Sequence, residues 1–244
     1  MTYSIFGADL KTGEIGLAST TVSLAVGGLI PFFSKSGAIA VSQAYAQPSL
    51  GPVMVERLDA GASLEDAIEA ARSSDQYFEF RQVAIITLDG GVAVHSGATC
   101  RPFTGHLHGN NCLAFGNVLS GEEVLREMVR EFEKKEGESL TERLVCALEA
   151  GRDFGGQAIN GNHLRERSAS VLVKNYHHEK VTDLRVDMSE HAVDDLRRTK
   201  IAVDLCEPYL RIRAEDPENC PPVIDFEQSL TAPKWFITAL DPTA

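Results

Sequence analysis

The stretch that decides the fold is Thr2-Tyr-Ser-Ile-Phe-Gly-Ala-Asp-Leu-Lys-Thr-Gly-Glu-Ile-Gly-Leu-Ala-Ser19. Residues 3–8 and 14–19 are rich in β-forming side chains, and residues 9–13 between them have the composition of a turn. The pattern predicts an antiparallel hairpin at the start of the chain. Thr2 then stands immediately before the first strand.

The remaining elements are predicted from periodicity and turn residues. A second hairpin is expected from residues 81–88 and 92–96, because Asp89-Gly-Gly91 separates two apolar segments. Single strands are expected at residues 37–44, 112–115, 168–174 and 181–186, and irregular loops at residues 97–111 and 155–167. Helices are expected at residues 53–58, 63–73, 122–136, 140–151 and 190–205. Helices in pairs between groups of strands indicate an α+β fold and argue against Rossmann and TIM-barrel arrangements.

Composition limits the class of protein. The chain has 244 residues, of which 43% are hydrophobic and 24% charged, as expected for a packed globular domain. Its formal net charge of -12 argues against a nucleic-acid partner, because a polyanion is repelled by an acidic surface. Five cysteines without a Cys-x-x-Cys pair indicate reduced thiols. The N-terminus lacks the features of a signal peptide, and the longest apolar stretch, residues 24–33, is too short to cross a bilayer. We therefore expect a cytoplasmic protein without a membrane partner.

Proline distribution divides the chain into two predicted parts. Residues 1–206 are expected to form the α+β domain, and residues 207–244 an extension. Six of the ten prolines lie in this extension, at Pro208, Pro217, Pro221, Pro222, Pro233 and Pro242. Such a segment favours extended packing on the domain or on another subunit, so we expect a homo-oligomer.

Thr2 is the candidate nucleophile. The sequence lacks the Gly-x-Ser-x-Gly, Gly-x-Gly-x-x-Gly, P-loop and His-Glu-x-x-His motifs of common enzyme classes. If Met1 is removed, the amine of Thr2 titrates near pKa ~8 and can accept the proton of its own hydroxyl. Lys35 is a candidate for lowering the pKa of that amine. The alternative is that Thr2 is simply a β-branched strand residue, and a retained Met1 would block the amine.

Two other clusters of polar residues are candidate sites. His106 and His108 have the spacing of half a metal site, but the sequence indicates no third ligand, so no metal is predicted. Asp183 and Arg185 alternate with apolar residues, which places both charges on one face of a strand. They either bind a polar substrate or form an exposed ion pair.

An ordered set of short motifs resembles a bacterial family known only as a domain of unknown function and placed in the N-terminal-nucleophile (Ntn) hydrolase superfamily. The motifs include Met1-Thr-Tyr-Ser-Ile5, Thr12-Gly-Glu-Ile-Gly16, Gly37-Ala-Ile-Ala-Val-Ser-Gln43, Arg81-Gln-Val83, Gly116-Asn117 and Asp183-Leu-Arg-Val-Asp187. The resemblance covers about residues 1–200. It implies a four-layer αββα sandwich of two antiparallel sheets flanked by helices.

The resemblance also implies site residues. Thr2 would be the nucleophile, Asn117 an oxyanion donor, Ser19 and Lys35 supporting catalytic residues. The expected substrate-binding residues are Gln43, His106, Asp183 and Arg185. The implied reaction is hydrolysis of a small amide or peptide-like molecule without a cofactor. Gln157 departs from the family pattern, where an aspartate is common.

Two alternatives remain open at this point. The chain is either such a hydrolase or a non-catalytic, ligand-binding or oligomeric protein that keeps Met1. A metal-dependent hydrolase at His106 and His108 would require a third ligand.

Overall fold

The computed structural model describes residues 1–175, 180–233 and 235–236. Backbone contacts divide the chain into a first unit, Met1–Leu196, and a second unit, Arg197–Ala244. The last part of the predicted extension, residues 237–244, lies outside the described residues. The predicted boundary near residue 206 therefore stays a prediction.

The first unit contains two large sheets and a small one, all antiparallel. The six-stranded sheet has the order β12-β11-β2-β1-β8-β7. Its strands are β1 Thr2–Asp9, β2 Glu14–Thr21, β7 Gly105–Gly109, β8 Cys112–Asn117, β11 Ser168–Asn175 and β12 Lys180–Val186. The four-stranded sheet has the order β3-β4-β5-β6, from β3 Pro31–Phe33, β4 Ala38–Ala44, β5 Arg81–Thr87 and β6 Val92–Ser96. The small sheet pairs β9 Gln157–Ile159 with β10 Asn162–Leu164.

Seven helices are described, in addition to a 3-10 turn at Phe78–Phe80. They are α1 Val26–Leu29, α2 Leu50–Asp59, α3 Leu64–Ser74, α4 Glu122–Lys134, α5 Leu140–Asp153, α6 Ala192–Glu215 and α7 Val223–Ser229. The α3 and α5 helices begin as predicted, because the hydroxyls of Ser63 and Ser139 accept hydrogen bonds from the backbone three residues later.

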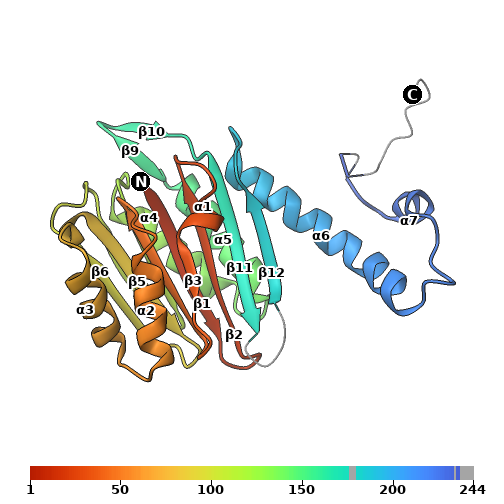
Figure 1. Ribbon diagram of the computed structural model, residues 1–244. Helices are drawn as coiled ribbons and strands as arrows, with labels where there is room; N and C mark the ends of the chain where they lie inside the picture. Colours follow the sequence, from red (N-terminus) through yellow and green to blue (C-terminus); the bar gives the residue numbers. More distant parts are fainter. Residues whose placement is uncertain (176–179, 234, 237–244) are drawn as a thin grey trace. The chain divides into compact units, whose positions relative to one another are not determined.

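Figure 1 shows α2 and α3 covering the four-stranded sheet. Three apolar clusters hold the first unit together. Successive residues of a strand point to opposite faces, so in β1 Tyr3 and Ile5 pack toward α4 and α5 while Phe6 points toward the four-stranded sheet. The second cluster lies between the two sheets and joins Phe6 to residues such as Ile39 of β4. The third lies between the four-stranded sheet and α2 and α3, where Met54 is fully buried.

The predicted α+β class with antiparallel sheets is confirmed, as are both hairpins. Two loop predictions were wrong. Residues 97–111 contain β7, an edge strand between two glycines, and residues 155–167 contain the short β9–β10 hairpin. These three strands are too short, and too rich in glycine or polar residues, to show a β pattern locally.

The last long helix also differs from its prediction. The α6 helix continues to Glu215, ten residues beyond the expected end, and Pro208 lies inside it. Proline removes one backbone donor but does not always end a helix.

In the second unit, the rings of Tyr209 and Phe226 lie 5.0 Å apart and join α6 to α7. Within the part of the chain that the structure describes, no helix is both long and apolar enough to span a bilayer.

Candidate functional site

Thr2 lies at the start of β1, between β2 and β8. The register places it opposite Thr21 of β2 on one side and Asn117 of β8 on the other. Side chains of directly opposed residues lie on the same face of a sheet. For Thr2, Thr21 and Asn117 this is the face that meets the four-stranded sheet, and all three are buried.

Thr2 makes hydrogen bonds to both neighbours. Its backbone N–H donates to Asn117 Oδ1 at 3.3 Å, and its hydroxyl donates to Thr21 Oγ1 at 3.3 Å. The Thr21 hydroxyl in turn donates to the carbonyl oxygen of Met1. The Thr21 hydroxyl thus contacts both the Thr2 hydroxyl and the Met1 carbonyl that precedes Thr2.

Two glutamines link this site to the opposite sheet. Ser4 Oγ lies 2.8 Å from Ser19 Oγ and donates to Gln43 Oε1 at 2.9 Å. Gln43 Nε2 donates to Gln82 Oε1 at 2.8 Å, and Asn117 Nδ2 donates to the same oxygen at 3.1 Å. All of these side chains are buried, and buried polar groups stabilise a structure only when they are paired. The network fixes the orientation of Asn117 relative to Thr2.

The expected role of Asn117 as an oxyanion donor stays a prediction. Its side-chain Nδ2 donates to Gln82 Oε1, and its Oδ1 accepts from the backbone N–H of Thr2. This arrangement suits Asn117 to hold the Thr2 nitrogen. The hydroxyl that contacts a carbonyl oxygen at the site is that of Thr21.

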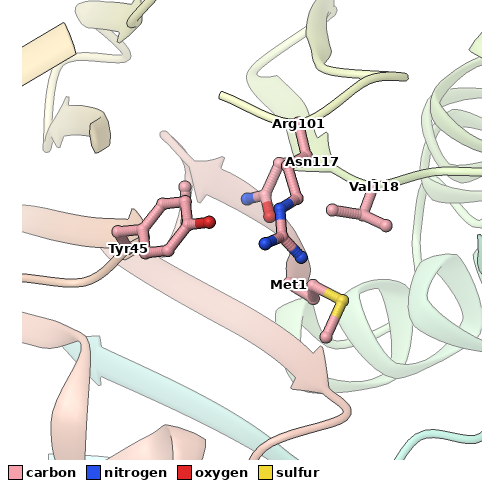
Figure 2. Close-up of a pocket in the computed structure, with 6 residues that line it drawn as sticks. Met1, Tyr45, Arg101, Asn117 and Val118 are labelled. Atoms are coloured by element: carbon pink, nitrogen blue, oxygen red, sulfur yellow. The ribbon is translucent and has the colours of Figure 1, made fainter. Parts of the chain in front are cut away.

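A pocket opens next to this site (Figure 2). It has a volume of about 140 Å³ and is lined by Met1, Ala44, Tyr45, Arg101, Asn117 and Val118. Ala44 and Val118 have φ values of 73° and 58°, in the left-handed region that alanine and valine rarely adopt. Backbone strain of this kind concentrates at functional sites, because the surrounding structure must enforce it.

A second, larger hollow shares Arg101 and Val118 with the pocket. Its volume is about 550 Å³. Apolar side chains of Phe103, Leu119 and Ile159 contribute to its lining. The two openings therefore meet at Arg101 and Val118, beside the end of β8.

The N-terminal amine lies in this environment. Burial lowers the pKa of the Met1 amine below its usual value, and the positive charge of Arg101 lowers it further. A larger fraction of the amine is then the free base at neutral pH.

Gln157 reaches the same strand end from the β9–β10 hairpin. Its side chain is fully buried, and its Nε2 donates to the backbone oxygen of Asn117 at 2.9 Å. Its Oε1 is buried and has no hydrogen-bond partner among the described residues. The position where the family resemblance implies an aspartate is thus next to Asn117.

Lys35 is not brought to Thr2. It is exposed and follows β3, with its backbone N–H donating to Asp59 at 3.2 Å. Its neighbour Ser36 lines a hollow with Leu10 and Gly13 of the β1–β2 turn, at the far end of β1. Because strand residues rise by ~3.4 Å each, the length of β1 separates Lys35 from the candidate nucleophile.

The other predicted substrate-binding residues lie at the edges of the six-stranded sheet. His106 is exposed on β7, and its ring lies 5.6 Å from that of His108. Arg185 lies on β12, opposite Ser170 of β11, and forms an ion pair with Asp187 at 3.4 Å. Asp183 lies on the same strand, two residues before Arg185. Among the described residues, no group of three or more possible metal ligands is found. Of the eight predicted site residues, Thr2, Ser19, Gln43 and Asn117 belong to one network.

Sequence analysis missed Thr21, Gln82 and Arg101. The position of Thr21 could have been predicted from the first hairpin, because a register with Asp9 opposite Glu14 places Thr21 opposite Thr2. Gln82 appears in the motif Arg81-Gln-Val83 but without a role, because its partners Gln43 and Asn117 lie on strands distant in the sequence. Arg101 lies in a loop between β6 and β7 and carries no local signal.

Comparisons with known proteins agree with this architecture. The model described as "Family of unknown function (DUF1028)" matches residues 2–196. A crystal structure of protein SPO2555 from Silicibacter pomeroyi, also assigned to that family model, is 28% identical to this chain. The match has a TM-score of 0.73 and covers 83% of this chain and 88% of that chain. No curated protein sequence matches the chain.

Proposed function

The chain belongs to the DUF1028 family of unknown function, and we propose that it is an Ntn-type amidohydrolase with Thr2 as its nucleophile. The observation that carries this proposal is the arrangement around Thr2 at the start of a central strand. Asn117 Oδ1 accepts a hydrogen bond from the backbone N–H of Thr2. The Thr21 hydroxyl contacts both the Thr2 hydroxyl and the carbonyl oxygen of Met1.

The proposal includes the finer fold assignment. In a four-layer αββα sandwich, two sheets face each other and helices cover both outer faces. The three apolar clusters, one between the sheets and one under each helical pair, support this assignment. A pocket lined by Met1 and Asn117, the neighbours of Thr2, supports the proposal that a substrate binds beside Thr2.

The proposed reaction begins after removal of Met1. The Thr2 amine takes the hydroxyl proton while Oγ1 bonds to the carbonyl carbon of an amide. The Thr21 hydroxyl stabilises the negative oxygen of the tetrahedral intermediate. The C–N bond then breaks, the leaving amine takes the proton, and water hydrolyses the resulting ester to an acid and free Thr2. This sequence requires no cofactor, and its substrate is a small amide or peptide-like molecule.

The test is intact-mass analysis of tag-free protein before and after reaction with a hydroxyl-directed acylating probe. We expect loss of Met1 and one adduct on Thr2. Thr2→Val should abolish the adduct, and Thr2→Ser should retain it. Thr21→Val should slow labelling by ~100-fold or more, as for loss of an oxyanion donor. Thr12→Val, an exposed threonine in the turn of the same hairpin, is the matched control.

A second candidate function is favoured by Met1 itself. Its carbonyl oxygen accepts a hydrogen bond from Thr21, and Met1 lines the pocket. A protein that keeps Met1 would bind a small ligand there without catalysis, alone or as an oligomer. Retention of Met1 together with an unlabelled Thr2 would exclude the hydrolase and favour this function.

A further inference from the structure

Arg101 is an exposed cation that lines the pocket. Among the described residues, no acidic side chain lies within ion-pair distance of its guanidinium. Other arginines of the first unit have such partners, including Arg72 with Glu79 at 2.7 Å, Arg81 with Asp75 at 2.8 Å and Arg152 with Asp194 at 2.5 Å. Arg101 differs from these three arginines, because it lines a pocket and has no such partner among the described residues.

The position of Arg101 is fixed by the backbone around it. Its carbonyl oxygen accepts a hydrogen bond from the N–H of Val118 at 3.1 Å, which ties it to the end of β8. Its guanidinium carbon lies 5.6 Å from the ring centroid of Tyr45. Figure 2 shows the guanidinium extending between Asn117 and Met1. The side chain itself is exposed, so a ligand that enters the pocket can reach its guanidinium.

Arg101 is the charged side chain among the residues that line the pocket, so its guanidinium is the group that would meet an anion there. Guanidinium groups bind carboxylates through two parallel hydrogen bonds, which neither a neutral group nor water can reproduce equally well.

We infer that the pocket recognises a carboxylate on the substrate, and that Arg101 selects amides bearing a carboxylate close to the bond that is cleaved. This inference rests on the proposed function for its reaction, but the binding of the anion does not depend on Thr2 acting as a nucleophile. The class of substrate is an N-acyl amino acid or a similar small acidic amide.

Pocket size supports this class. A volume of about 140 Å³ is below the range of ~300–1,000 Å³ typical of drug-sized ligands, so the pocket accepts only a small group. The adjoining hollow, with Phe103, Leu119 and Ile159 in its lining, offers an apolar surface for the rest of the molecule. The carboxylate would bind at Arg101, where the two openings meet.

The test is isothermal titration calorimetry with two probes that differ in charge, N-acetylglycine and its neutral amide, N-acetylglycinamide. We expect the intact protein to bind the carboxylate ~10-fold or more tightly than the amide at low ionic strength. Arg101→Gln should remove this preference, and Arg101→Lys should restore part of it. Arg126→Gln is the matched control, because it removes an exposed arginine of α4 that pairs with Glu122.

Each outcome separates this inference from the proposed function. Thr2→Val should keep the preference for the carboxylate even though it cannot be acylated, and it also prevents turnover during the titration. Equal affinity for both probes, no binding of either, or an unchanged preference in Arg101→Gln would overturn the inference. If the preference holds while Thr2 is never labelled, the anion site stands and the hydrolase fails. If Thr2 is labelled but the protein does not prefer the carboxylate, the hydrolase stands and the anion site fails.

Discussion

The two ends of the space between the large sheets differ sharply. At one end, Phe6 of β1 packs on Phe115 of β8 with ring centroids 5.1 Å apart, within an apolar cluster. At the other end, only two to four residues earlier along β1, the same face carries Ser4 and Thr2 within a hydrogen-bonded network. Gln43 and Gln82 face them from the opposite sheet.

This difference shows how one strand serves two purposes. Ser4, Phe6 and Thr2 all point to the same face because side chains alternate along a strand. The apolar end supplies the burial that holds the sheets together, since burying an aromatic side chain contributes ~1.5–3 kcal/mol. At the polar end each buried donor or acceptor needs a hydrogen-bond partner, because leaving one without a partner lowers the stability of the fold by ~1–3 kcal/mol. A site with fixed geometry is thereby built into the edge of the core.

The largest expected effect is at the apolar end. Phe6→Ala should lower the free energy of unfolding by ~3–5 kcal/mol, because it leaves a cavity among fully buried residues. Urea unfolding measures this loss. Labelling of Thr2 in the protein that remains folded should be unchanged, since the Phe6 side chain makes no hydrogen bond and so takes no part in the hydrogen-bonded network. A loss below ~1 kcal/mol would contradict the view that this end carries the stability.

A smaller loss of stability is expected at the polar end. Gln82→Leu removes the partner of Gln43 and Asn117 and should cost ~1–3 kcal/mol in unfolding experiments. Unlike Phe6→Ala, it should also slow acylation of Thr2, because Asn117 loses the contact that orients it. A variant with normal labelling would show that the network stabilises the fold without positioning the site. Gln47→Leu, outside this network, is the control.

Loss of one hydroxyl should have a milder effect. Ser19→Ala removes a hydrogen bond to Ser4 but leaves Ser4 bonded to Gln43, so we expect a cost of ~1 kcal/mol. The predicted catalytic role of Ser19 is tested by the same variant. Unchanged labelling of Thr2 would assign Ser19 to support of the network, whereas a large decrease at unchanged stability would assign it a direct part in the reaction.

The smallest expected effect is a shift in titration. In the chain that carries Met1, the pKa of the amine is lowered from the usual 8.0, first by burial and then by Arg101. The unfolded chain therefore binds more protons between the two pKa values, and stability should rise with pH up to about 8. The pH midpoint of amine carbamylation, followed by mass spectrometry, should lie below 8.0. Arg101→Gln should raise this midpoint part of the way, because burial remains. A midpoint at or above 8.0 would contradict the placement of the amine in the pocket.

The sequence by itself determined the local elements and the identity of the nucleophile candidate. Turn residues at positions 9–13 and 89–91 specified two hairpins, and serine caps specified the starts of α3 and α5. The motifs also indicated the family. These features depend on neighbours within a few residues, so they can be read from the chain directly. The short strands β7, β9 and β10 were missed because neighbouring strands, more than their own pattern, hold them in place.

Only the tertiary structure decided which side chains share the site. Asn117 meets the nitrogen of Thr2 across 115 residues, and Gln43 meets Gln82 across 39. Sequence order suggested Lys35 as the partner of Thr2, but the register of the sheets places it at the opposite end. The tertiary structure also places Arg101 in the lining of the pocket, without a carboxylate partner among the described residues. Sheet pairing between distant strands sets these distances, and no local pattern encodes it.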